Sequence, residues 1–286
     1  MGVSKKAAKI AGLFVLAASL YSGDRADFEG DIWAGDKNAL EVKFTSAGRA
    51  VAIPPAGELS VATYNIKYGH IDREGVVKTA RSLGASVLGL TEAGPNIARQ
   101  IAGDEYEIIR GGAGNIMLSS LPVKESFSEE LPSEHGRSPR TALFAKLQVG
   151  EHDMWFVLTH LTNDEWPDSS ESIRLEQLNA LNKIIDERLQ GGALVLGDFN
   201  FEPDTPEFRL MDDQYDDGLT ELGLGNMGTF RGGLGQKRLD YMFIDEGLGY
   251  GAIAGGRDGS DASDHMPIII VLAPSGGHGP LPAVIE

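Results

Sequence analysis

Six short apolar runs, each carrying an acid, an amide or an imidazole at one end, constrain this chain more than any other feature of its sequence. Runs of apolar and β-branched residues bounded by Gly and Pro are typical of buried strands. A polar group repeated at strand ends is how a sheet gathers a site from distant parts of a chain. The runs therefore predict one assembled site. In chain order, the polar residues at their ends are Asn65, Glu92, His160, Asp198 with Asn200, Asp240, and Asp264 with His265.

The length and composition suit one large α/β domain. The chain has 286 residues, of which 42% are hydrophobic, and this is enough for a sizeable core. The absence of cysteine excludes disulfides, thiolate metal sites and a cysteine nucleophile. The net charge of −17 argues against a protein that holds nucleic acid by broad phosphate neutralisation. It leaves open an enzyme that contacts a few phosphates through a local cluster and a bound metal.

Four segments are expected along the chain. In residues 1–22, three lysines precede the apolar stretch 10–20, a pattern typical of an export signal or anchor. We therefore expect a secreted, extracytoplasmic or membrane-anchored protein; the alternative is a cytoplasmic protein with a short amphipathic or buried helix here. Residues 23–57 are expected to form a lead-in segment with one hairpin, residues 58–273 the main domain, and residues 274–286 a flexible tail.

Helices and strands alternate within the expected domain. Residues 72–83 carry apolar residues at helical spacing behind Asp72, a plausible N-cap, and residues 95–102 form a shorter candidate. Asp168 with Glu171 resembles a capping box ahead of a long helix that ends at Gly191. The mixture of βα units and meanders predicts mixed sheets covered by helices. Further strands are expected at residues 106–110, 115–119, 123–127 and 141–149.

The end of one run carries a carboxylate suited to a metal. Phosphate esters resist hydrolysis because their anionic oxygens repel a nucleophile, so an enzyme must neutralise these oxygens and deprotonate a water. Magnesium can do the first task when one or two carboxylates hold it. Glu92 fits this role, although taken alone it fits a solvated turn carboxylate better.

Asp198 and Asn200 form the second polar group. In an extended segment, residues two apart point the same way, so both side chains would face one pocket while Phe199 packs behind them. The alternative is an Asx-type turn after a strand, which is common for this spacing. The four residues from Ala193 to Leu196, all apolar, favour the functional interpretation.

The third group combines imidazoles and carboxylates. His265 is the natural proton acceptor, and a carboxylate on its other ring nitrogen would fix its tautomer. Asp240 points away from the face shared by Leu239 and Tyr241, so it needs a polar partner. His160 offers a second imidazole to a phosphate, although a single histidine after a strand is more often structural.

Seven stretches occur in an order that is specific to one family. In its motifs the chain resembles the endonuclease/exonuclease/phosphatase superfamily, which has the deoxyribonuclease I-like fold. The resemblance implies an α/β four-layer sandwich, with two packed mixed β-sheets flanked by helices and a site at one edge. The matching stretches are T-Y-N-I at 63–66, L-T-E at 90–92, G-N-I-M-L-S-S at 114–120, T-H-L at 159–161, G-D-F-N at 197–200, R-L-D-Y at 238–241 and S-D-H-M-P at 263–267.

The same resemblance implies roles for the matched residues. Glu92 would be the main Mg²⁺ ligand, with Mn²⁺ as a substitute ion, and Asn65 and Asp264 would lie close to the metal. The resemblance leaves open whether His265 or Asp198 takes the proton of the water, and we favour His265. Many family members carry Gln at the position of Thr91. The other implied roles are binding of nucleophile and phosphate by Asp198 and Asn200, contact of His160 with the scissile phosphate, and orientation of His265 by Asp240.

The resemblance implies a metal-dependent phosphoesterase. The prediction is a hydrolase of phosphodiester bonds, an endonuclease or exonuclease on DNA. A phosphodiesterase or phosphatase on lipid or small phosphorylated substrates is the alternative, and an inactive binding scaffold is disfavoured because no matched position is lost. We expect Arg140, Arg231 and Arg238 to contact substrate phosphates, although each alone fits surface charge. No protein partner is implied, and we expect a monomer. The acidic residues 212–217 are expected to form a solvated loop.

Overall fold

The computed structural model describes residues 32–34, 58–133, 139–163, 167–232 and 235–275. The chain divides into the units Met1–Gly30 and Asp31–Glu286, and the description below concerns the second unit. The expected export segment at 1–22 and the expected hairpin within 23–57 lie outside the described residues, as do residues 276–286 of the expected tail. These expectations stay predictions.

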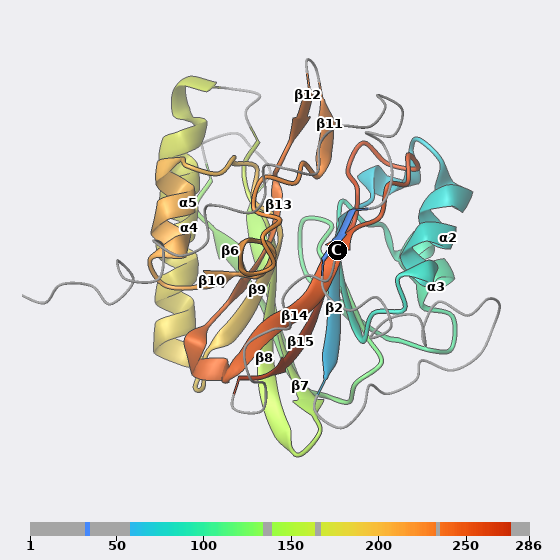
Figure 1. Cartoon of the computed structure of the whole chain (residues 1–286), viewed down its shortest axis with the longest axis horizontal. Helices are drawn as coiled ribbons and strands as arrows, with labels where there is room; N and C mark the ends of the chain where they lie inside the picture. Colours follow the sequence, from blue (N-terminus) through green and yellow to red (C-terminus); the bar gives the residue numbers. More distant parts are fainter. Residues whose placement is uncertain (1–31, 35–57, 134–138, 164–166, 233–234, 276–286) are drawn as a thin grey trace, which may run out of the picture. The chain divides into compact units, whose positions relative to one another are not determined.

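The first sheet has seven strands (Figure 1). Its only parallel pair among the described strands joins β2 to β3, and the other neighbours are antiparallel. In spatial order the strands are β1 (Ile32–Ala34), β14 (Tyr250–Arg257), β15 (Ile268–Pro274), β2 (Leu59–Asn65), β3 (Val87–Thr91), β5 (Ile116–Ser119) and β4 (Glu107–Arg110).

The second sheet has six strands and repeats this arrangement, with β8 and β9 as its parallel pair. A separate hairpin, formed by β11 (Phe230–Gly232) and β12 (Gly235–Lys237), precedes β13 in the sequence. In spatial order the strands of the sheet are β10 (Asp216–Asp217), β13 (Asp240–Ile244), β9 (Ala193–Asp198), β8 (His152–His160), β7 (Arg140–Val149) and β6 (Val123–Leu131).

The two sheets pack face to face, and strand alternation explains why their central strands are apolar throughout. In β15, Ile268 and Ile270 join the core between the sheets, while Ile269 and Val271 join the core under the helices. A strand that is buried on both faces becomes a continuous apolar run. The sheets approach closely at Gly89, where an added Cβ would lie 2.8 Å from Leu158 Cδ1.

Helices cover the outer face of each sheet and complete four layers (Figure 1). The helices α2 (Arg73–Ser82) and α3 (Pro95–Ala102) lie over the first sheet, and α4 (Pro167–Arg188) and α5 (Pro206–Asp212) lie over the second. Shorter elements are α6 (Gly218–Glu221), η3 (Lys67–Gly69) and η4 (Glu246–Leu248).

Several local predictions are confirmed. Asp72 caps α2 by accepting a hydrogen bond from the Gly75 backbone N–H at 3.0 Å. The strands β4 to β7 lie within three residues of their predicted starts, and α3 has its predicted bounds. The side chains at the start of α4 are not described, so the capping box at Asp168 stays a prediction.

The structure also differs from the sequence prediction in two places. Strand β14 was not predicted because three of its eight residues are glycine, a composition typical of loops. Gly255 is needed there, since an added Cβ would lie 2.7 Å from the backbone oxygen of Ile269. The expected solvated loop at 212–217 is wrong for Asp217, which is 2% exposed and paired with Arg238.

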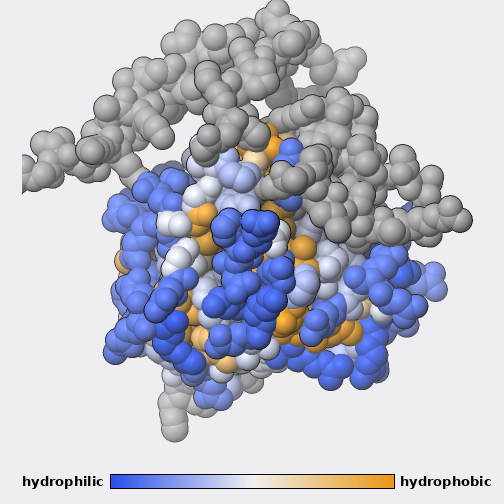
Figure 2. Space-filling view, turned by 90° about the horizontal axis from the view of Figure 1, so that it is seen from below, coloured by the Kyte–Doolittle hydropathy of each residue, from blue (hydrophilic) through white to orange (hydrophobic). Residues whose placement is uncertain are grey.

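The surface at the lower end of the molecule, as it is drawn in Figure 1, is mainly hydrophilic in the described part of the chain. Figure 2 shows this lower end, where hydrophilic residues surround small hydrophobic patches in the described part of the chain. Within the described ranges, no helix is both long enough and apolar enough to cross a membrane.

Candidate active site

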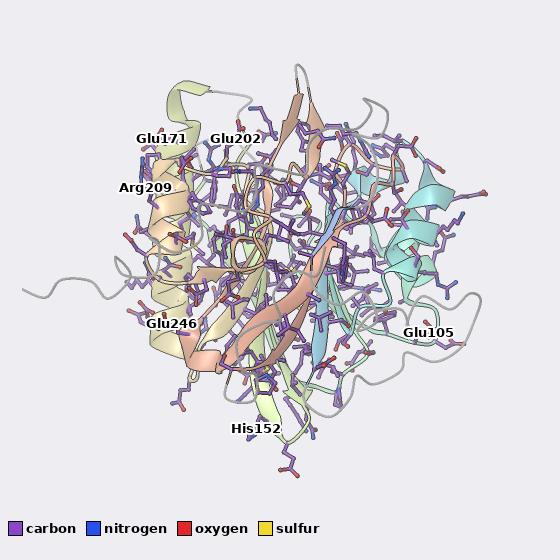
Figure 3. The ribbon with its side chains drawn as sticks, in the orientation of Figure 1. Glu105, His152, Glu171, Glu202, Arg209 and Glu246 are labelled. Atoms are coloured by element: carbon purple, nitrogen blue, oxygen red, sulfur yellow. The ribbon has the colours of Figure 1, made fainter. Side chains whose placement is uncertain are left out.

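The polar residues predicted from the run ends meet at one edge of the two sheets. The parallel strands β8 and β9 end side by side at His160 and Asp198, and the antiparallel strand β13 begins next to them at Asp240. Figure 3 shows the direction: His152, where β8 begins, lies at the lower end, and Glu202, just beyond β9, lies near the upper end. The site therefore lies toward the upper end.

Asn65, the last residue of β2, connects the two sheets. Its Nδ2 donates to Glu92 Oε1 at 3.1 Å and to Asp198 Oδ2 at 2.9 Å. Its Oδ1 accepts the Lys67 backbone N–H at 3.0 Å. Because a backbone N–H can bond only to the amide oxygen, this contact fixes the amide orientation. The expected position of Asn65 close to the metal stays a prediction: its nitrogen orients two carboxylates, and its oxygen accepts one backbone N–H.

Asp198 lies at the centre of the site and is 1% exposed. Its Oδ2 is 3.5 Å from His160 Nε2 and 3.6 Å from His265 Nε2. The sequence places it there through Gly197, which has φ 141°, and where an added Cβ would lie 1.9 Å from the Thr159 backbone oxygen. Only glycine fits at this position, so the approach of β9 to β8 depends on it.

Asn200 does not extend beside Asp198 as expected. Its φ is 54°, and its backbone N–H donates to Asp198 Oδ1 at 3.1 Å. Its Nδ2 donates to the Leu161 backbone oxygen at 3.1 Å. The Asx-type alternative is therefore the correct interpretation of the geometry, and Asn200 orients Asp198 through its backbone. Phe199 is fully buried behind the site, as predicted.

His265 and Asp240 form the pair that the sequence predicts. His265 Nδ1 lies 2.8 Å from Asp240 Oδ2, and this oxygen also accepts the Thr229 hydroxyl at 2.7 Å. Thr229 in turn accepts the Asp240 backbone N–H at 3.1 Å. The contact at Nδ1 turns the other ring nitrogen toward Asp198.

The hairpin β11–β12 holds the loop that carries His265. The Arg231 backbone N–H donates to the Asp264 backbone oxygen at 2.8 Å, and the Met266 N–H donates to the Thr229 oxygen at 2.7 Å. The Phe230 ring lies 4.7 Å from the His265 ring, centroid to centroid. The hairpin therefore holds the loop of His265 through its backbone and contacts the imidazole through Phe230.

The two imidazoles differ in charge. Burial lowers the pKa of His160 to about 4, against the opposing effect of Asp198. Burial acts in the same direction on His265, but the carboxylates of Asp240 and Asp198 outweigh it and raise the pKa of His265 to about 9. At neutral pH the site thus holds a neutral imidazole and an imidazolium on either side of one carboxylate.

Comparison with known proteins identifies the family. The model described as the Endonuclease/Exonuclease/phosphatase family matches residues 62–265, more than half of the chain. The chain belongs to this family. It is therefore an enzyme, a hydrolase of phosphoester bonds. No curated protein matches it.

Solved structures of the endonuclease/exonuclease/phosphatase family confirm the fold class, an α/β four-layer sandwich. At these low identities the likeness establishes the fold alone. One of these structures is D. rerio TDP2 complexed with single-strand DNA product, with 16% identity and a TM-score of 0.63 over 75% of this chain and 98% of that one. Another is the human Nocturnin catalytic domain with bound sulfate anion, with 14% identity and a TM-score of 0.62 over 76% of this chain and 93% of that one. A third is Bacteroides thetaiotaomicron mannosyl-6-phosphatase, with 16% identity and a TM-score of 0.59 over 75% of this chain and 99% of that one.

Enzymes of this family depend on divalent metal ions, and two half-buried carboxylates suit one. Glu92 accepts Asn65 at one oxygen. Asp264 accepts the Lys67 ammonium at Oδ2, 2.5 Å away, and its Oδ1 lies 3.3 Å from the Ser263 hydroxyl. Hard oxygen ligands next to solvent are what Mg²⁺ takes in proteins, because the ion keeps several of its waters. The residues present therefore fit a metal of this kind.

A second group of possible ligands lies deeper. Single atoms of Asp198, Asp240 and His265 lie within 4.8 Å of one another. Asp240 bonds His265 and Asp198 accepts Asn65, but the buried Oδ1 of Asp240 has no hydrogen-bond partner among the described residues. The predicted ligands Glu92 and Asp264 are carboxylates that solvent reaches, and their role at the metal stays a prediction.

The three predicted substrate-binding arginines have different surroundings. Arg238 is 3% exposed and pairs with Asp217 Oδ1 at 2.6 Å, so its expected substrate contact is corrected to a structural one. Arg231 is half-buried and donates to the backbone oxygens of Ser260 and Gly259, both at 2.7 Å, which stabilises the loop before Asp264. Arg140, half-buried at the start of β7, acts on His160 through its charge and keeps its predicted role as a proposal.

Sequence reasoning missed three residues of the site. Lys67 follows Asn65 by two positions, and its αL conformation gives no signal in the sequence. Thr229 bonds Asp240 from a hairpin that was not predicted. Ser263 donates to the Asn65 backbone oxygen at 2.9 Å, and its place next to Asp264 in the matched stretch is the one signal that could have revealed it.

Proposed function

We propose that the protein is a Mg²⁺-dependent hydrolase of phosphodiester bonds, and specifically a nuclease that acts on DNA. The observation that carries the proposal is the hydrogen-bonded path from Glu92 through Asn65 to Asp198, which ends between His160 and His265. It connects the carboxylates that suit a metal to the groups that suit proton transfer.

The charges of the two imidazoles support Asp198 as the proton acceptor. A histidine with a pKa near 9 is protonated at neutral pH and cannot accept a proton from water. The imidazolium of His265 instead suits stabilisation of a phosphate oxygen, with Asp240 holding it in place. We therefore revise the preference for His265 as the base. A bound ion at Glu92 and Asp264 would neutralise a phosphate oxygen and stabilise the leaving oxygen.

His160 completes the phosphate contacts in this proposal. It is neutral at neutral pH, because burial lowers its pKa to about 4. Its Nε2 faces Asp198 at 3.5 Å, and its 4% exposure leaves it at the floor of the site. A neutral ring nitrogen there can donate to a phosphate oxygen while the charge of His265 balances the phosphate.

A nucleic-acid substrate is supported by one comparison and by Arg140. D. rerio TDP2, which shares the fold, was solved with single-strand DNA product. Arg140 places a positive charge next to His160, where a second phosphate of a strand would lie. The alternative is a phosphatase or phosphodiesterase on lipid or small phosphorylated molecules. The net charge of −17 favours it, because this charge repels a long polyanion.

A substrate panel tests the proposal. Purified protein with Mg²⁺, with and without chelator, is incubated with plasmid, single-stranded DNA, RNA, phosphomonoesters and small phosphodiesters. The matched variants are Asp198→Asn and Asp153→Asn, the latter an exposed carboxylate near the start of β8. We expect Mg²⁺-dependent DNA cleavage that Asp198→Asn removes and Asp153→Asn retains. Cleavage of monoesters alone would contradict the nuclease proposal and support the alternative.

A further inference from the structure

Lys67 lies in a backbone conformation that directs it back over the site. Lys67, Tyr68 and Gly69 have φ values of 44°, 54° and 69° in succession. The left-handed region is unfavourable for residues that carry a Cβ, so surrounding contacts must hold this turn. The Lys67 N–H bonds Asn65 Oδ1 at 3.0 Å, and the Tyr68 N–H bonds the Glu92 backbone oxygen at 2.7 Å. The turn is thus fixed by the residues that it covers.

The side chain of Lys67 ends at a carboxylate that we assign to the metal. Its Nζ lies 2.5 Å from Asp264 Oδ2, and the charge of Glu92 also acts on the ammonium. The Asp264 side chain is 22% exposed and the Lys67 side chain 45%. Exposed ion pairs usually contribute little, but this carboxylate is largely withdrawn from water, and the backbone of the lysine is held in place.

An ammonium and a divalent ion compete for the same oxygen. Both are cations that require a carboxylate lone pair, and their mutual repulsion is strong at short distance. The other oxygen of Asp264 lies 3.3 Å from the Ser263 hydroxyl, which donates its proton to the Asn65 backbone oxygen at 2.9 Å. A divalent ion that takes Oδ2 of Asp264 therefore displaces Lys67, whereas no lysine contacts Glu92 in the part of the chain that the structure describes.

We propose that the ammonium of Lys67 competes with the divalent ion for Asp264 and so weakens the binding of that ion. When the ion displaces it, the ammonium is free to contact a phosphate oxygen of the substrate. This inference rests on the proposed function only in taking Glu92 and Asp264 as the carboxylates that face the ion.

The test is Mn²⁺ binding to the full, metal-stripped protein by isothermal titration calorimetry. Lys67→Met removes the charge and keeps the stem, and we expect it to tighten Mn²⁺ binding on the order of 10-fold, as loss of a unit charge next to the ion requires. Lys67→Arg keeps the charge and should bind Mn²⁺ within about 2-fold of the parent. Turnover should fall in Lys67→Met despite the tighter binding.

Two controls separate competition from general electrostatics. Arg73 is exposed, packs next to Gly69 and bonds Gln100, so Arg73→Gln removes a nearby charge that does not contact Asp264. This variant should bind Mn²⁺ within about 2-fold of the parent, because exposed charges are screened. Asp264→Asn should weaken Mn²⁺ binding more in the Lys67→Met background than in the parent, because in that background the ion binds Asp264 without displacing an ammonium.

Unchanged or weaker Mn²⁺ affinity in folded Lys67→Met would overturn the inference, as would equal tightening in Arg73→Gln. Lys67→Gln replaces the methionine variant if circular dichroism shows that the latter does not fold. The result is independent of catalysis. A parent that cleaves no phosphoester but shows this dependence on Lys67 would refute the proposed function and support the inference.

Discussion

His265 Nδ1 and Asp240 Oδ2 lie 2.8 Å apart, and this contact gives the site its imidazolium. Asp240 is itself fixed by Thr229, which bonds the same oxygen at 2.7 Å. The charge of Asp240, with that of Asp198, raises the pKa of His265 to about 9 against the effect of burial. Activity that needs the imidazolium should therefore be lost as pH rises through about 9.

The first prediction is that Asp240→Asn moves this alkaline limit to lower pH. Removing the carboxylate takes away the largest contribution that stabilises the protonated ring, so burial then lowers the pKa of His265. Turnover at neutral pH should fall on the order of 10²-fold, because the imidazolium is lost and the ring is no longer oriented. The measurement is a pH–rate profile of both proteins. An alkaline limb that stays in place in the variant would show that the limb does not report His265.

The second prediction concerns stability and pH. The folded pKa of His160 is about 4, below its unfolded value of about 6.5, so its contribution to stability is lost as pH falls from 6.5 toward 4. The folded pKa of His265 is about 9, so its contribution is complete below about 6.5 and is lost as pH rises toward 9. These two groups together place the maximum of Tm near pH 6.5.

Thermal denaturation between pH 4 and pH 9 measures that maximum. His160→Gln keeps a polar side chain without the titration and should flatten the acid side of the curve while leaving the alkaline side unchanged. If Tm falls as steeply below pH 6.5 in the variant as in the parent, the loss of stability in acid comes from carboxylates and not from His160.

The third prediction separates two arginines. Arg238→Met leaves the buried carboxylate of Asp217 unpaired, which should cost about 3–5 kcal/mol of stability. The folded fraction should keep its KM, because Arg238 does not face solvent. Arg140→Gln should instead raise KM several-fold with little change in Tm. Denaturant unfolding and steady-state kinetics check both variants, and a KM effect from Arg238→Met alone would restore its predicted substrate contact.

The fourth prediction is that Gly197→Ala disrupts both fold and site. Its Cβ would lie 1.9 Å from the Thr159 backbone oxygen, and φ 141° is closed to residues with a side chain. We expect a loss of about 3 kcal/mol or more, with activity reduced because Asp198 follows directly. Gly150→Ala is a matched control, since it also has positive φ but no atom within 4 Å of an added Cβ. Similar losses in both would assign the effect to backbone conformation alone.

Most of the fold and the centre of the site could be predicted because a short stretch of sequence is enough to indicate a buried strand and the residue at its end. The continuous apolar run of β15 reports burial on both faces, and Asp198 stands directly after such a run in β9. That Asp240 needs a polar partner could be predicted from its apolar neighbours, and the family resemblance named that partner as His265.

The remainder depended on contacts that the sequence does not encode locally. The amide orientation of Asn65 is set by the Lys67 N–H, and Arg238 is buried because Asp217 lies opposite it. Asn200 turns instead of extending because its N–H bonds Asp198. Arg238 and Asn200, which were expected to contact substrate or phosphate, are thus used to hold the structure, and only the folded chain shows which partner each has.

The location of a divalent ion tests the account most directly. Crystals grown with Mn²⁺ give an anomalous difference map that locates the ion without reference to activity. We predict a single peak in contact with the Glu92 carboxylate, on the side of Asp264. A peak among Asp198, Asp240 and His265, or no peak at a concentration that saturates the protein in solution, would contradict the site proposed here.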